Sequence, residues 1–116
     1  MPKKAILVAS FDPDLADVRK RVLEGAGYRV VPATDLLAVR AGCESETIAL
    51  VVIGYSLPPS EKRRVWYEVR QHCGKNVPIL ELLNASTPIL SDEAVGVHFS
   101  QGPDDLVDKV REILER

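Results

Sequence analysis

The sequence contains no hydrophobic run long enough to cross a membrane, and its longest apolar segments, such as residues 48–54, are only strand-sized. It also lacks a strong charge of either sign, because 15 basic and 17 acidic residues leave a formal net charge of −2. Such a balance provides no long-range field to attract nucleic acid or an anionic membrane, so we expect neither as a partner. The first residues lack the pattern of a signal peptide, which makes the cytoplasm the expected compartment.

Cysteine is scarce as well. Cys43 and Cys73 are the only two, and no Cys-x-x-Cys motif is present. The two cysteines could form a disulfide, or they could bind a metal ion together with His72, the one nearby histidine. Because nothing local supports either, we predict two unpaired thiols in or near the core.

What the chain does have is an alternation of two kinds of apolar segment. Short runs rich in β-branched residues predict strands at residues 5–9, 28–31, 48–53, 77–83 and 95–99. The first and third runs are almost continuously apolar, which is typical of strands covered on both faces in a parallel sheet. With 116 residues, 46% of them hydrophobic, the chain is long enough for one core, and we expect a single domain over residues 1–116.

Helical patterns lie between these strands. Asp12 and Pro13 predict the start of a first helix that ends at Gly27. We expect its inward face to consist of Leu15, Val18, Val22 and Ala26.

Three more helices are predicted. The second spans residues 34–42, the third starts with Ser60 as its cap and ends before Gly74, and the last begins at Pro103. Their inward faces are expected to be Val65, Trp66, Val69 and Cys73 in the third helix, and Leu106, Val107, Val110, Ile113 and Leu114 in the last.

This order predicts an α/β fold with helices on both faces of the sheet. We expect the first and last helices on one face and the second and third on the other. Between residues 84 and 94 the sequence holds Pro88 and little periodicity, so a fourth helix there should be short or irregular.

Four segments of the chain resemble the receiver domain of bacterial response regulators. The opening AILVASFDPDLADVRKRVLEGAGYRVVPATD is similar to the first strand, first helix and second strand of that family. LVVIGYSLPPS resembles the third strand and its loop, VPILELL the fourth strand, and GPDDLVDKVREILER the final helix. The resemblance implies a CheY-like, flavodoxin-like, doubly wound sheet with the strand order 2-1-3-4-5.

The resemblance also implies a phosphorylation site at the carboxyl ends of the strands, and this sequence departs from it. Ser10 and Phe11 stand where the family has two carboxylates that hold Mg²⁺, and Gly54 stands in place of the phosphoacceptor aspartate. Without them the site has neither a nucleophile nor hard oxygen ligands for the metal.

The two remaining family positions differ too. Leu83, or Asn84 if the register moves by one, replaces a hydroxyl residue, and Phe99 replaces a lysine. Ser10, Ser56 and Ser100 are expected near the same edge, but no histidine base accompanies them. We therefore expect no enzyme activity, no cofactor and no metal, and a receiver that cannot accept a phosphoryl group.

Basic residues are expected on the surface. They are Arg19, Lys20 and Arg21 in the first helix, and Lys62, Arg63, Arg64 and Arg70 in the third. Trp66 is expected to pack on the core and Tyr67 to point away from it.

Two functions remain in competition, with a flavodoxin-like enzyme ranked behind both. The first is a signalling module of a two-component or related pathway that acts by protein contact or weak self-association, through a surface containing Ile89, Leu90 and Val97. The second is a small-molecule sensor that uses an uncharged notch left by Ser10, Phe11 and Gly54 at the carboxyl edge of the sheet.

Overall fold

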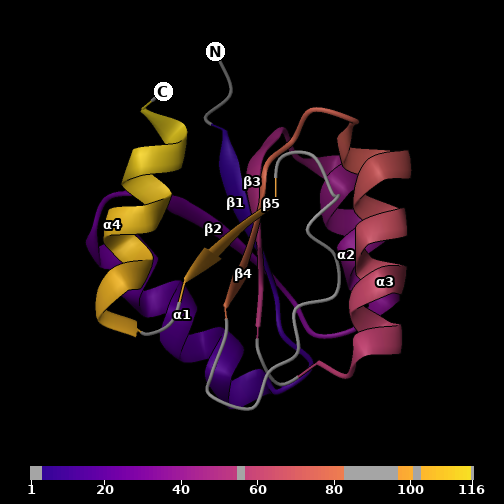
Figure 1. The fold of residues 1–116 in the computed structure, drawn as a ribbon, viewed down its shortest axis with the longest axis horizontal. Helices are drawn as coiled ribbons and strands as arrows, with labels where there is room; N and C mark the ends of the chain where they lie inside the picture. Colours follow the sequence, from indigo (N-terminus) through magenta and orange to yellow (C-terminus); the bar gives the residue numbers. More distant parts are fainter. Residues whose placement is uncertain (1–3, 55–56, 83–96, 101–102, 116) are drawn as a thin grey trace.

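Five parallel strands form one sheet in the order β2-β1-β3-β4-β5 (Figure 1). The computed structural model describes residues 4–54, 57–82, 97–100 and 103–115 of the chain. The strands are β1 (Ala5–Ala9), β2 (Arg29–Ala33), β3 (Ile48–Ile53), β4 (Ile79–Leu82) and β5 (Val97–Ser100). Every neighbouring pair is parallel, and β1 lies between β2 and β3. The predicted flavodoxin-like class and strand order are confirmed.

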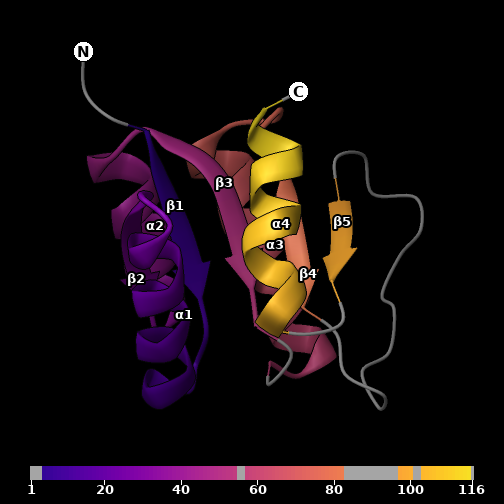
Figure 2. The ribbon, with the colours of Figure 1, turned by 90° about the vertical axis from the view of Figure 1, so that its left-hand side faces the viewer.

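Helices cover both faces of this sheet (Figures 1 and 2). They are α1 (Pro13–Gly25), α2 (Leu36–Ser45), α3 (Pro59–Glu68) and α4 (Pro103–Leu114), and α3 continues directly into a π-helical turn, η1 (Val69–Cys73). As predicted, α1 and α4 lie on one face and α2 and α3 on the other (Figure 1). The fourth helix expected at residues 84–94 lies outside the described residues.

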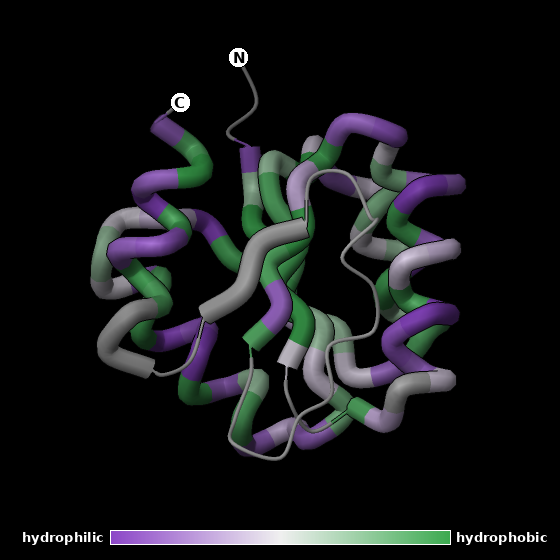
Figure 3. Tube along the Cα trace, viewed as in Figure 1, coloured by the Kyte–Doolittle hydropathy of each residue, from purple (hydrophilic) through white to green (hydrophobic). Residues whose placement is uncertain are grey.

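The core consists of one apolar layer on each side of the sheet. The central strands β1 and β3 are among the most hydrophobic parts of the chain, while many residues on the outer sides of the helices are hydrophilic (Figure 3). All residues of β1 are buried, as are all but one of β3, because helices cover both their faces. Side chains of one strand alternate between the layers: Leu7 and Val51 face α2 and α3, whereas Ile6 and Leu50 face α1 and α4.

The inward face of α1 differs from the predicted one. Val18 is 54% exposed and Val22 is 38% exposed, whereas Ala16, Arg19 and Leu23 are buried. The inward stripe is therefore turned by one residue, about 100° around the helix. The prediction followed apolar residues only and so excluded the one charged residue that the helix buries.

The ends of the other helices follow the predictions with two exceptions. The helix α2 continues to Ser45, past the predicted end near Gly42, which lies inside the helix and is buried there. Ser60 is not the cap of α3, which begins at Pro59 after Pro58 and has no side-chain cap. The glycine stops are confirmed, because Gly27 after α1 and Gly74 after η1 both have positive φ angles, 97° and 126°. The apolar stripe of α4 is confirmed by its three buried residues, Leu106, Val110 and Ile113.

The two cysteines are not the unpaired thiols that we predicted. A disulfide joins Cys43 in α2 to Cys73 at the end of η1, with the two Cα atoms 4.6 Å apart. The pairing arises because α2 packs along α3 and η1 on the same face of the sheet. Spacing along the sequence carries no information on that contact.

Ion pairs accompany the disulfide between these helices. Arg40 in α2 donates two hydrogen bonds to the Glu68 carboxylate, at 3.0 and 3.1 Å. His72 lies 3.0 Å from Glu44 and 3.2 Å from Glu68. The Arg40 guanidinium lowers the pKa of the Glu68 carboxyl through these hydrogen bonds. Polar side-chain contacts therefore join α2 to α3 and η1 in addition to the disulfide.

Candidate functional site

The carboxyl ends of β1 and β3 place Ser10 and Gly54 side by side. Ala9 and Ile53, the last residues of the two strands, are register partners. The backbone N–H of Gly54 donates to the carbonyl of Ala9 at 2.9 Å, and that of Ser10 donates to the carbonyl of Ala33 at 3.0 Å. In open α/β sheets this edge is the usual location of a ligand or catalytic site.

A guanidinium from α1 lies directly over this pair. Arg19 Nη1 donates to Ser10 Oγ at 3.2 Å, and the Ser10 hydroxyl donates to the carbonyl of Asp12 at 3.2 Å. A Cβ atom added to Gly54 would lie 2.7 Å from Arg19 Nη1 and 3.3 Å from Ser10 Oγ. The Arg19 side chain therefore occupies the space that a side chain at position 54 would need.

This arrangement corrects two expectations. Arg19 is not a surface residue, since it is only 7% exposed. The notch expected at Gly54 and Ser10 is neither empty nor uncharged, which removes the geometry on which the sensor hypothesis depended. Asp12 is the helix cap that the sequence predicted, and its carboxylate accepts hydrogen bonds from the N–H groups of Asp14 and Leu15.

A second group of buried charges lies beside this edge, between β4 and α3. Glu81, in β4, is the register partner of both Ile53 and Phe99. Its Oε1 accepts a hydrogen bond from Trp66 Nε1 at 3.0 Å. Lys62 is 1% exposed and Glu81 is fully buried. Lys62 is therefore not the surface residue that we expected.

Burial sets the protonation chemistry of this pair. Among the described residues, neither Lys62 Nζ nor Glu81 Oε2 has a hydrogen-bond partner. Burial lowers the pKa of the Lys62 ammonium, and the nearby Glu81 carboxylate partly offsets that shift. Burial raises the pKa of the Glu81 carboxyl, against the opposing effects of Lys62 and Trp66. Both charges are thus costly where they lie, and each stabilises the other.

The sequence held a signal for the burial of Lys62, although we expected this residue on the surface. Lys62 lies three residues before Val65 and four before Trp66, so it continues the inward stripe of the third helix. Glu81 gave a similar signal, because it is the single acidic residue in a strand whose other residues are all apolar. Arg19 gave the same kind of signal, because it lies three residues after Ala16 and four before Leu23, but apolar spacing alone had placed Val18 and Val22 on the inward face.

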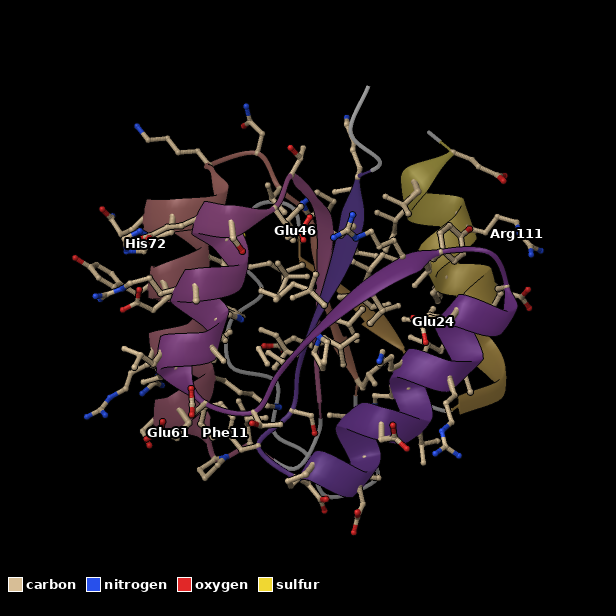
Figure 4. All side chains as sticks on the ribbon, turned by 180° about the vertical axis from the view of Figure 1, so that it is seen from behind. Phe11, Glu24, Glu46, Glu61, His72 and Arg111 are labelled. Atoms are coloured by element: carbon tan, nitrogen blue, oxygen red, sulfur yellow. A yellow bond between two sulfur atoms is a disulfide. The ribbon has the colours of Figure 1, made fainter. Side chains whose placement is uncertain are left out.

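The other predicted site residues are placed only in part. Phe11 is half-buried and packs against the layer beneath α2 and α3, at the carboxyl end of the sheet (Figure 4). Residues 55–56 and 83–96 lie outside the described residues, and with them Ser56, Leu83, Asn84, Ile89 and Leu90. Val97 and Phe99 belong to β5, but their side chains are not described.

The described residues of this edge do not fit the Mg²⁺ ion that the family resemblance implies. Magnesium requires carboxylate or other hard oxygen ligands, and the groups that meet here are a hydroxyl, a glycine backbone and a guanidinium. A fixed positive charge would repel the ion. In the part of the chain that the structure describes, no cluster of three or more His, Cys, Asp or Glu side chains could hold a metal.

Receiver domains of response regulators share this fold. Chemotaxis protein CheY4 of Vibrio cholerae superposes with a TM-score of 0.80 at 18% identity, covering 97% of this chain and 99% of that one. A putative response regulator from Chloroflexus aurantiacus J-10-fl gives 0.80 at 26% identity, over 98% and 99% of the two chains. The receiver domain of the sensor histidine kinase PA1611 from Pseudomonas aeruginosa PAO1, solved with a magnesium ion in its active-site cleft, gives 0.77 at 20% identity, over 98% and 99%.

These neighbours establish a CheY-like receiver fold over nearly the whole chain. No protein-family model matches the sequence, and no curated protein matches it. Within the described residues, no helix is both long and apolar enough to span a bilayer.

Proposed function

We propose that this chain is a receiver-like signalling domain, of a two-component or related pathway, that acts by protein contact without aspartyl phosphorylation. The observation that carries the proposal is the Arg19 guanidinium, which lies over Gly54 and donates to Ser10. By resemblance, a phosphorylatable receiver has a carboxylate nucleophile and metal-binding acids at these positions. Here a buried cation takes their place.

The charge at this edge explains why phosphorylation is not expected. Phosphoryl transfer to an aspartate needs both the carboxylate that attacks and a metal that offsets the charge developing on the phosphoryl oxygens. Position 54 offers no nucleophile, and the described groups around it are unsuited to a cation. We therefore propose that the domain is not an enzyme and takes no cofactor or metal.

The proposed partner is another signalling protein, or a second copy of the chain in a weak homodimer. A domain without a covalent trigger has no evident means of moving between two states, since a ligand shifts an equilibrium only when it binds the two states unequally. We propose a contact surface that is always available, in the cytoplasm.

Phosphorylation chemistry tests this proposal directly. The chain is incubated with a small phosphodonor and Mg²⁺, and its intact mass is measured alongside a phosphorylatable receiver as the positive control. We expect no added phosphoryl mass and no beryllium fluoride complex. A stable acyl phosphate on any residue would overturn the proposal.

Two variants show which missing group matters. Gly54→Asp restores a carboxylate but not the acid pair, and its carboxylate should pair with Arg19 rather than with a metal. We expect it to stay unphosphorylated, and to be more stable at neutral pH than its uncharged, equal-sized control Gly54→Asn. The triple variant Ser10→Asp/Phe11→Asp/Gly54→Asp tests whether the fold retains a site that can hold Mg²⁺ once the acids return. Phosphorylation of Gly54→Asp alone would show that Arg19 does not block the site.

A further inference from the structure

The disulfide lies at the opposite end of the sheet from the site described above. Cys73 is the last residue of η1, beside the loop that leads into the amino end of β4. An open groove of about 620 Å³ lies there, lined by Cys73 together with the starts of β1 and β3 and the end of α4. That volume is in the range of small-molecule sites.

The groove is positively charged. Lys4 and Lys75 line it with Asn76, and both lysines are exposed. All of its lining residues belong to the described part of the chain, and none of them is an acid. The groove on this side of Cys73 therefore favours an anion, although the whole chain has a net charge of −2 and Glu44 and Glu68 lie next to His72, outside the lining.

The two halves of the disulfide differ in access. Cys43 is 7% exposed and belongs to the apolar layer beneath α2 and α3. Cys73 is half-buried at the edge of that layer and also lines the groove. A reagent in the groove thus reaches Cys73 first.

We infer that the Cys43–Cys73 disulfide is a thiol-exchange site for a small anionic thiol that enters this groove. The thiolate attacks Cys73 Sγ, a new sulfur–sulfur bond forms, and the bond to Cys43 breaks. Cys43 leaves as a thiolate and takes up the proton that the attacking thiol has lost. The product is a mixed disulfide on Cys73 and a free thiol at Cys43. A second thiol then releases Cys73 and forms the small-molecule disulfide, so that two thiols are oxidised and one protein disulfide is reduced.

Contacts next to the disulfide allow this exchange in the folded protein. The Arg40–Glu68 and His72–Glu44 pairs join α2 to α3 and η1 independently of the sulfur bond. The backbone N–H of Gly74 donates to the carbonyl of Val69 at 3.1 Å and closes the π-helical turn. Reduction therefore loosens the end of η1 without releasing the helix. A disulfide that reacts in this way suits a redox-responsive protein of a reducing compartment, where purely structural disulfides are rare.

The test measures how fast thiols of different charge open the disulfide. The full oxidised chain is treated with reduced glutathione, which is anionic, or with cysteamine, which is cationic, and samples are quenched by alkylation for mass spectrometry. The charge-reversed variant Lys4→Glu/Lys75→Glu is compared with Arg63→Glu/Arg64→Glu, which has the same net charge but is altered in the middle of α3, outside the groove lining. We expect the groove variant to react roughly tenfold more slowly with glutathione and faster with cysteamine. The control should keep the wild-type rates.

Peptide mapping identifies the cysteine that is attacked. In the variant Cys43→Ser, oxidised glutathione should leave a stable mixed disulfide on Cys73. In the wild-type chain the transient adduct should map to Cys73 as well. Equal rate changes in the two charge variants, a first adduct on Cys43, or reaction only after denaturation would each overturn the inference.

Discussion

At the scale of single residues, buried charges are the feature that separates this chain from an ordinary α/β core. Lys62 and Glu81 lie within 1% of complete burial, held between β4 and α3. Removing two charges from water costs several kcal/mol per ion, and their mutual attraction offsets only part of that cost. Such a pair contributes little to the free energy of unfolding, but removal of one partner lowers that free energy strongly, because the other charge is then buried alone.

Exchange of this pair for apolar residues tests that balance. We expect Lys62→Met or Glu81→Leu alone to lower the free energy of unfolding by about 3–5 kcal/mol, because each leaves the other charge buried without its countercharge. The double variant should recover most of that loss or exceed the wild type by about 1–4 kcal/mol. Urea denaturation of all four proteins measures the coupling. Additive losses in the double variant would mean that the two charges do not interact.

The same pair predicts a pH dependence with a definite sign. Burial raises the pKa of the Glu81 carboxyl, so the folded state binds that proton more tightly than the unfolded state does. Stability must then fall as the pH rises from the ordinary carboxyl value, about 4.3, through the folded pKa. The fall should be steepest in Lys62→Met, which has lost the charge that holds this pKa down. Urea midpoints measured from pH 4 to pH 8 check this, with Lys62→Met/Glu81→Leu as the control that should lack the effect.

At the scale of elements, the burial of α1 decides how its substitutions behave. Leu23 is fully buried, whereas Val18 is 54% exposed. We expect Leu23→Ala to cost about 2–5 kcal/mol through lost apolar contacts and the cavity that remains. Val18→Ser should change stability by less than about 0.5 kcal/mol. Thermal or urea unfolding of both variants measures these changes. If the inward face were the one that apolar spacing predicted, Val18→Ser would instead be the destabilising substitution.

The disulfide also constrains the helices, because it links α2 to the end of η1 through two cysteines that are 30 residues apart in the sequence. Closing a loop of that length removes entropy from the unfolded chain, which corresponds to about 3–4 kcal/mol of stability. We expect reduction, or the variant Cys43→Ser/Cys73→Ser, to lower the free energy of unfolding by that amount, which urea denaturation measures as a lower unfolding midpoint. Oxidised and reduced protein with the same midpoint would show that the bond is not formed in solution.

Elements were more predictable from this sequence than the contacts between them. Periodicity identified β1, β3 and α4 nearly to the residue, since each is one continuous apolar pattern. The family resemblance supplied the strand order, which no local pattern contains. The positions of Arg19, Lys62, Glu81 and the disulfide depend on side chains that cross between elements, and only the folded chain shows those contacts.

At the scale of the whole molecule, the question is which face meets a partner. Ile89, Leu90 and Val97 are the predicted contact residues, and their side chains lie outside the part of the chain that the structure describes. The outer side of α3 offers a second face, where Tyr67 is 63% exposed next to the exposed Arg63 and Arg64. An exposed aromatic beside arginines is a common anchor of protein interfaces.

Affinity measurements on the identified partner separate these faces. Cross-linking of the tagged chain in its native cell supplies the partner, and calorimetry gives its Kd. We expect Ile89→Ser/Leu90→Ser to weaken binding at least tenfold, and Tyr67→Ser/Arg63→Ser to leave it unchanged. The reverse result, in variants that unfold at the wild-type urea concentration, would move the interface to α3.

The wild-type Kd should also be the same with and without a phosphodonor and Mg²⁺. If phosphorylation does not occur, a phosphodonor has no means of changing the conformation of the contact surface. A Kd that depends on the phosphodonor would therefore show that a second conformational state exists.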